Sequence, residues 1–169
     1  MLQSGRLMVA FLLIGLALIA GCDSGTSANR SDESNASAVA LKTISRGKID
    51  FIQGYSDGYQ RAQEEGKPML VFFTAQWCNF CHQMEAEAFA DSQVVQLASQ
   101  FVCILVDADQ EPAVCQEFRV RGYPTIQFLS ARGVPLNRMT GKRPAQQVAA
   151  QMQAALLATA TRESQTTVR

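Results

Sequence analysis

The sequence has no surplus of charge. Its 15 Lys and Arg residues balance 15 Asp and Glu residues, and it has one histidine. A protein that binds nucleic acid needs concentrated positive charge to meet the phosphates, so this composition indicates no nucleic-acid partner. The N-terminal apolar run, residues 7–20, is shorter than the roughly 20 residues of a membrane-spanning helix. The hydrophobic fraction of 47% is nevertheless enough to build the core of one ordinary domain.

A basic residue, an apolar run and a cysteine follow one another at the start of the chain. Arg6 precedes the apolar run, and Ile19-Ala20-Gly21-Cys22 puts small residues directly before the cysteine. This segment resembles a bacterial lipoprotein signal peptide, whose cysteine is lipidated and becomes the mature N-terminus. We therefore predict a signal peptide at 1–21 and a lipid anchor at Cys22, with the domain on the periplasmic or extracellular side of the cell membrane. An uncleaved anchor and ordinary secretion are the alternatives.

The next stretch is rich in Ser, Asn, Ala, Gly, Thr and charged residues, and it has no aromatic residue before Phe51. Such a composition buries too little apolar surface to order itself. We therefore predict a lipidated cysteine and flexible linker over 22–48, a folded domain over 49–158 and a polar tail over 159–169.

Within the folded part, short apolar runs alternate with segments of helical periodicity. The first run, 68–74, is nearly all apolar, as in a strand that is covered on both faces. Further strands are predicted at 101–107, 122–129 and 136–140, and helices at 55–65, 80–90, 92–99, 111–118 and 144–158. Strands that alternate with helices and end in a hairpin predict an α/β fold, with a mixed central sheet and helices on both faces.

Two cysteines, Cys78 and Cys81, stand where the first strand gives way to a helix. At a helix N-terminus the free backbone N–H groups and the helix dipole stabilise an anion, so we expect a lowered pKa for the Cys78 thiol. Cys81 lies one turn further along on the same side, within disulfide reach. The pattern therefore predicts a reversible dithiol/disulfide site.

The same residues carry a family resemblance. A strand, Trp77-Cys78-x-x-Cys81, a helix and a later Tyr123-Pro124-Thr125 at a strand entry together resemble the thioredoxin superfamily, over roughly 49–158. Lys67-Pro68, Met84-Glu85 and Phe89-Ala90-Asp91 are most similar to the C-terminal thioredoxin-like domain of the membrane electron transporter DsbD and related extracytoplasmic lipoproteins. The resemblance implies a thioredoxin fold and a thiol-disulfide oxidoreductase that needs no cofactor.

The resemblance also implies a role for each residue of the motif. Cys78 matches the attacking thiol and Cys81 the resolving thiol. Pro124 matches a cis-proline beside the disulfide, a backbone feature almost confined to proline. Tyr123 would then offer its backbone to an extended substrate segment. Trp77 matches an aromatic shelf beside the nucleophile, with simple packing as the alternative.

The sequence departs from the family at one position. Thioredoxins and the DsbD domain usually carry a carboxylate six residues before the first cysteine, where it accepts protons, and that position here is Phe72. The lysine that neighbours this carboxylate in thioredoxins aligns with Cys103. Glu85, one turn after Cys81, matches a second acidic position of the DsbD domain and is our candidate substitute. The alternative is a solvated glutamate on the helix surface.

The resemblance implies partners as well. We expect disulfide-containing exported proteins as substrates, a membrane electron donor resembling DsbD, contact with the membrane through the lipid anchor, and a monomer. The similarity to DsbD favours a reductant over an oxidant.

Other functions and pairings compete with this hypothesis. Cys78 to His82 also satisfies C-x-x-C-H, the attachment motif of c-type haem, although its place between a strand and a helix speaks against haem. We expect no metal site, because the family's cis-proline blocks the cysteines. A redox-inactive binding module is a third possibility. Cys103 and Cys115 can be free buried thiols or a structural disulfide, and Cys103 could also exchange with Cys81.

Overall fold

The structure is a computed structural model that describes residues 41–166, with side chains up to Arg162. The predicted signal peptide, Cys22 and most of the predicted linker lie outside the described residues. Within the described part of the chain, no helix combines the length and the apolar character needed to cross a bilayer.

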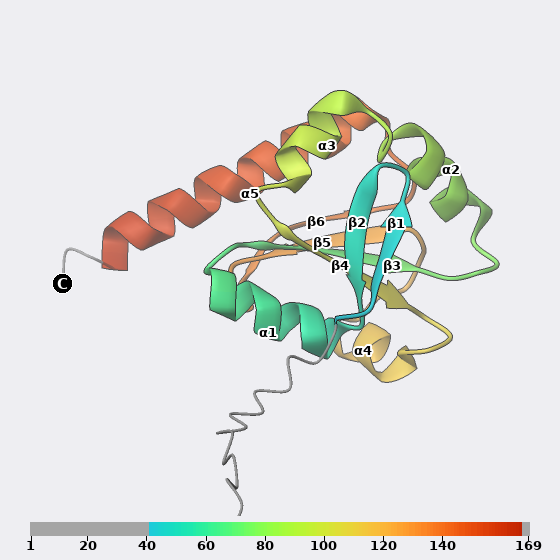
Figure 1. The fold of residues 1–169 in the computed structure, drawn as a ribbon, viewed down its shortest axis with the longest axis horizontal. Coiled ribbons are helices and arrows are strands. Elements are labelled where there is room, and N and C mark those ends of the chain that lie inside the picture. The colour runs from blue at the N-terminus through green and yellow to red at the C-terminus, as the bar shows by residue number, and fades with distance from the viewer. Residues whose placement is uncertain (1–40, 167–169) are drawn as a thin grey trace, which may run out of the picture. The chain divides into compact units, whose positions relative to one another are not determined.

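One six-stranded sheet organises the domain (Figure 1), in the order β1-β2-β4-β3-β5-β6. β2, β4 and β3 are parallel to one another, whereas β1, β5 and β6 run antiparallel to their neighbours. The predicted mixed sheet is therefore confirmed. The strands are β1 (Thr43–Arg46), β2 (Ile49–Gln53), β3 (Met69–Thr74), β4 (Val102–Asp107), β5 (Thr125–Leu129) and β6 (Pro135–Thr140).

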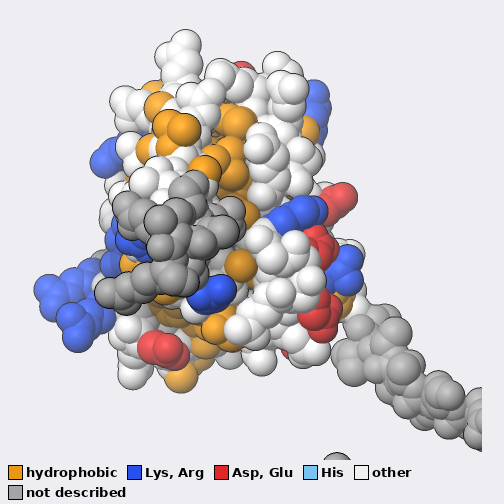
Figure 2. Space-filling view, turned by 90° about the vertical axis from the view of Figure 1, so that its left-hand side faces the viewer, with side chains coloured by type: hydrophobic (Ala, Val, Ile, Leu, Met, Phe, Trp, Pro, Cys, Tyr) orange, Lys and Arg blue, Asp and Glu red, His pale blue; other side chains and the backbone are white. Residues whose placement is uncertain are grey.

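Five helices cover the two faces of the sheet, as predicted. They are α1 (Tyr55–Glu65), α2 (Asn79–Glu87), α3 (Ser92–Ala98), α4 (Pro112–Glu117) and α5 (Ala145–Thr166). The core on one face is shared with α2, α3 and α5, and the core on the other face with α1 and α4 (Figure 1). On the side of the molecule that is at the left in Figure 1, hydrophobic side chains reach the surface in a narrow band between charged ones (Figure 2).

The two central strands, β3 and β4, are covered on both faces of the sheet. Every residue of β3 and of β4 is buried, because successive side chains of a strand point to opposite faces and both faces are covered. Leu70 and Phe72 enter one core, and Val71 and Phe73 enter the other. These continuous apolar runs place the ends of β3 and β4 side by side, at Thr74 and Asp107.

The domain begins earlier than predicted. The linker boundary at 48 was wrong, because β1 lies inside 22–48 and pairs with β2 through a tight turn. Gly47 in this turn has φ +61°, which favours glycine. β1 is only four residues long and half exposed, so its order depends on β2 rather than on its own composition.

The C-terminal boundary was also wrong, since α5 continues past 158 to Thr166. Residues 158–162 alternate alanine with threonine and arginine, and alanine is the strongest helix former. The hydroxyls of Thr159 and Thr161 donate to the carbonyl oxygens of Ala155 and Leu157, each at 3.0 Å. A polar composition therefore did not end this helix.

Candidate active site

The turn between β3 and α2 brings the two predicted cysteines together. Cys78 is the N-cap of α2, and its sulfur is bonded to that of Cys81, with the two Cα atoms 5.3 Å apart. The backbone N–H of Cys81 donates to Cys78 Sγ at 3.2 Å. A hydrogen-bond donor and the positive end of a helix thus face the sulfur of Cys78, an arrangement that favours negative charge on this atom when the disulfide is open.

Aromatic rings fill the position where the family resemblance places a carboxylate. Phe72 is fully buried, with its ring 5.9 Å from that of Phe51 and 4.9 Å from that of Phe89. A charge in this cluster would lose its water without gaining a partner. The site therefore has an apolar floor, and Phe72 itself carries no group that could accept a proton.

Exposed aromatic side chains lie beside the disulfide. Trp77 is 65% and Phe80 61% exposed, which is unusual for such large apolar groups. The ring of Trp77 stands edge-on to Tyr123, with centroids 5.7 Å apart, and its Nε1 donates to Asp109 Oδ1 at 3.4 Å. Trp77 thus lies on the surface and not in the core.

The Tyr123–Pro124 peptide bond is cis, as the resemblance implied. The Pro124 carbonyl oxygen accepts a hydrogen bond from Gly141 N at 2.7 Å, which ties this loop to the end of β6. The Tyr123 hydroxyl is hydrogen-bonded to the Cys115 thiol, and burial together with this bond raises the pKa of Tyr123 to about 12. Cys115 therefore supports the loop from inside, a role that no motif in the sequence indicated.

Glu85 is not the solvated surface glutamate of the alternative hypothesis. Its side chain is buried, with Oε1 3.7 Å from Arg46 Nε and Oε2 3.6 Å from His82 Nδ1. His82 Nε2 in turn lies 3.0 Å from the carbonyl oxygen of Gln76. Arg46 belongs to β1, inside the segment predicted as linker, so no motif indicated that it is part of the site.

A cavity of about 270 Å³ adjoins this group of charged residues. Its walls come from the ends of β1, β3 and β4, from the turn before Cys78 and from α2. The lining residues are Arg46, Thr74, Ala75, Gln76, His82 and Asp107.

A family model described as a thioredoxin-like domain matches residues 55–156. The chain belongs to the thioredoxin-like domain family. A probable protein disulfide-isomerase A6 from Medicago sativa is 27% identical over 112 residues, or 66% of this chain and 31% of that protein. The thiol:disulfide interchange protein DsbD of Yersinia enterocolitica is 35% identical over 86 residues, or 47% of this chain and 15% of that protein. The chain thus spans less than a third of either relative.

Solved structures confirm the thioredoxin fold. A thioredoxin from Thermus thermophilus superposes with a TM-score of 0.59 at 25% identity, covering 63% of this chain and 87% of that one. The C-terminal domain of Neisseria meningitidis DsbD, in its oxidised form, gives a TM-score of 0.52 at 19% identity and covers 58% and 89%.

The other two cysteines of this thioredoxin-like domain are free, so the alternative of a bridge between them was wrong. Cys103 and Cys115 belong to the cores on opposite faces of the sheet. Cys103 Sγ donates to the carbonyl oxygen of Ala98, 3.8 Å away, and does not approach the redox pair as a bonded partner. Burial raises the pKa of Cys103 to about 12 and also raises that of Cys115.

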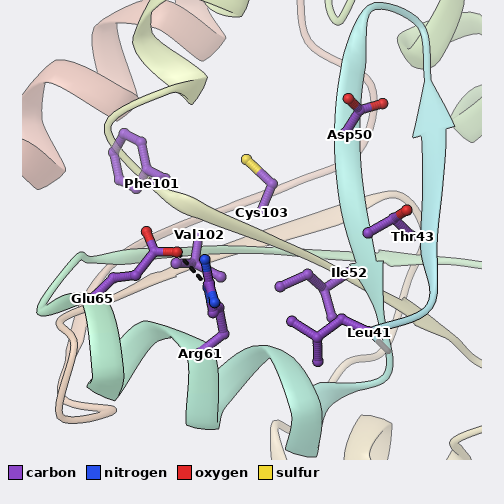
Figure 3. Close-up of a pocket in the computed structure, with 9 residues that line it drawn as sticks. All are labelled: Leu41, Thr43, Asp50, Ile52, Arg61, Glu65, Phe101, Val102 and Cys103. Atoms are coloured by element: carbon purple, nitrogen blue, oxygen red, sulfur yellow. Dashed lines mark hydrogen bonds and ion pairs between the residues drawn. The ribbon is translucent and has the colours of Figure 1, made fainter. Parts of the chain in front are cut away.

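Cys103 lines a cavity of about 480 Å³ between α1 and the first residues of β4 (Figure 3). β2 pairs with β4 only at Ile52 and Gln53, so the two strands diverge beside this cavity. The paired side chains of Arg61 and Glu65 lie on the α1 side, and Cys103 points to the other side of β4 (Figure 3).

The haem alternative does not fit this thioredoxin-like domain. Haem c attachment uses both cysteine sulfurs as thioethers and a histidine nitrogen as the iron ligand. Here the two sulfurs are bonded to each other, and His82 directs its ring nitrogens at Gln76 and Glu85. The short C-x-x-C-H match therefore reflects the redox motif followed by a helix-surface histidine.

Proposed function

We propose that this protein is a membrane-anchored, extracytoplasmic thiol-disulfide oxidoreductase that reduces disulfides of exported proteins. The observation that carries the proposal is the Cys78–Cys81 disulfide at the N-terminus of α2, next to the cis Tyr123–Pro124 bond. The likeness to DsbD and to a protein disulfide-isomerase supports the same chemistry.

The reaction uses the reduced pair. The Cys78 thiolate attacks a substrate disulfide, forming a mixed disulfide and releasing one substrate thiolate, which takes a proton from solvent. Cys81 then loses its proton and attacks Cys78 Sγ, closing the protein disulfide and releasing the second substrate thiolate. Two electrons pass to the substrate, and a membrane donor resembling DsbD returns the pair to the reduced state.

Substrate recognition uses the exposed rings and the cis-proline loop. Trp77 and Phe80 offer apolar surface next to the disulfide, and Tyr123 offers backbone groups to an extended segment. Substrates are therefore unfolded or extended stretches of exported proteins around a disulfide.

Glu85 takes the proton of Cys81 in this proposal. It lies one helical turn after Cys81 on α2, and residues four apart share one face of a helix. With Phe72 in the usual place of the carboxylate, Glu85 is the buried acid of α2. Replacing Glu85 with Gln should slow closure of the disulfide by about tenfold or more, and an unchanged pH–rate profile would remove Glu85 from the mechanism.

The exchange reaction is tested by trapping. In Cys81→Ala, Cys78 can still attack a substrate disulfide, but no second thiol resolves the mixed disulfide that forms. Mixed disulfides with substrates should therefore accumulate in cells and disappear on reduction. Cys103→Ala is the matched control and should trap nothing. Absence of adducts under several growth conditions would contradict substrate turnover.

The direction of electron flow follows from the reduction potential of the pair. A value near that of thioredoxin, about −270 mV, supports a reductant, and a value near about −120 mV would make the protein an oxidant.

The anchor rests on the N-terminal sequence alone and needs a separate experiment. Cells grown with labelled palmitate should incorporate label into the parent protein in the membrane fraction, and Cys22→Ala should lose the label and leave that fraction. Label that persists in Cys22→Ala would contradict the anchor.

A further inference from the structure

A partly buried ion pair joins the β1–β2 hairpin to the helix that carries Cys81. Arg46 Nε and Glu85 Oε1 lie 3.7 Å apart, both atoms are shielded from solvent, and neither has a hydrogen-bond partner among the described residues. At this separation the contact is an attraction between charges. A carboxylate taken out of water is strongly destabilising unless a cation accompanies it, so Arg46 is what makes this position tolerable for Glu85.

The turn of the hairpin lies directly on the backbone of α2. A Cβ atom at Gly47 would come within 2.3 Å of the Glu85 carbonyl oxygen and within 2.8 Å of the Phe89 carbonyl carbon. The next residue, Lys48, donates its N–H to the Phe89 oxygen at 2.9 Å. Glycine lets the two backbones approach this closely, and the approach fixes Arg46 over Glu85.

Few other charges face this carboxylate. His82, from the same helix, approaches Oε2 of Glu85, and Arg46 approaches Oε1 from the hairpin. Both of these residues line the 270 Å³ cavity, together with the buried Asp107 at the end of β4. The two partners of Glu85 therefore connect it to a polar cavity next to the turn that carries Cys78.

We propose that Arg46 is a positioning residue for the exchange reaction. It holds the Glu85 carboxylate one turn from Cys81, where the carboxylate takes the thiol proton as Cys81 sulfur attacks Cys78. The proton then passes from Glu85 to solvent through the cavity that Arg46 and His82 line. This inference rests on the proposed role of Glu85.

The experiment measures how fast the reduced pair is oxidised as the pH changes. The full chain is purified in detergent, reduced, and mixed with excess glutathione disulfide, and the fluorescence of Trp77, its single tryptophan, is followed. Arg46→Met and Arg46→Lys are compared in the parent and in Glu85→Gln. Lys48→Met removes the same charge from the exposed side of the same hairpin and is the matched control.

Arg46→Met should slow oxidation by about fivefold, as expected for coupled contacting residues, and change the pH–rate profile, because the Glu85 carboxylate loses the cation that faces it. In the Glu85→Gln background it should change neither rate nor profile. Arg46→Lys should recover part of the loss, and Lys48→Met should match the parent.

Three results would overturn the proposal. The first is an equal slowing by Arg46→Met in both backgrounds, which would mean that it acts by loosening the hairpin. The second is an effect of Lys48→Met as large as that of Arg46→Met. The third is a Glu85→Gln variant with the parent profile, which would remove the role of Glu85 while leaving Cys78–Cys81 exchange intact. If Arg46→Met fails to fold by thermal melting, Arg46→Lys in the two backgrounds gives the same comparison.

Discussion

The two cysteine pairs of this domain are buried to the same degree. Cys78 and Cys81 are 5% and 0% exposed. Cys103 and Cys115 are 7% and 5% exposed. Cys78 and Cys103 differ in the group that faces the sulfur. A backbone N–H at a helix N-terminus faces Cys78, whereas a carbonyl oxygen faces Cys103. A donor stabilises a thiolate, so the N–H offsets the cost of burial at Cys78, whereas no donor among the described residues does so at Cys103, where burial raises the pKa. Depth alone therefore does not set the reactivity of these thiols.

The largest expected effect is the difference in reductase activity between variants at Cys78 and at Cys103. Cys78→Ser should abolish reduction of a disulfide-containing peptide, because a serine hydroxyl is not a nucleophile that attacks a disulfide. Cys103→Ala should keep a rate close to that of the parent. A peptide reductase assay with each purified variant checks this contrast, and residual turnover in Cys78→Ser would show that another thiol acts as the nucleophile.

Next in size is the apolar floor under the redox pair. Phe72→Ala should lower the free energy of unfolding by about 3–5 kcal/mol, and Phe72→Asp by more, since an unpaired carboxylate would replace a ring of the aromatic cluster. Urea unfolding measures both. Phe80→Ala removes the same side chain from the surface and should change stability by about 0.5 kcal/mol or less. Similar losses at the two positions would contradict the burial difference.

The third prediction uses the raised pKa of Cys103. The folded value of about 12 lies above the ordinary value of 9.0, so the folded state holds this proton more tightly than the unfolded chain does. The stabilisation is complete below pH 9 and is lost as the pH rises towards 12, with a slope of about 1.4 kcal/mol per pH unit. Unfolding curves at increasing alkaline pH should show a shallower decline for Cys103→Ala. Parallel declines would place Cys103 in a solvated setting.

The smallest effect concerns the exposed rings. Trp77→Ala should lower kcat/KM for protein substrates by about fivefold, as for an exposed aromatic contact residue, and leave the reaction with glutathione disulfide unchanged. Leu157→Ala, at an exposed apolar residue on α5, is the control and should alter neither value. An equal loss with both substrates would mean that Trp77 tunes the disulfide and does not bind substrate.

The sequence predicted what depends on neighbouring residues. The strand before Cys78, the helix after it and the cis bond at Pro124 each belong to a short motif, and all three are present. The same local reasoning placed α1 over Tyr55–Glu65.

What the sequence missed depends on contacts between distant segments. Arg46 joins the site only because β1 pairs with β2 and the turn packs on α2. The free state of Cys103 and Cys115 follows from which face of the sheet each residue enters, and that is decided by the path of the chain from β4 into α4. The continuation of α5 beyond 158 could have been found from its alanines.

The weak attachment of the hairpin has a consequence for local opening. β2 is paired with β4 at two residue pairs, whereas β3 and β4 are paired at six. Segments held by few hydrogen bonds open on their own, well below the free energy of global unfolding. Amides of β1 and β2 should therefore exchange with deuterium before those of β3. Each such opening separates Arg46 from Glu85. The proton transfer proposed for Glu85 would therefore be interrupted each time the β1–β2 hairpin opens.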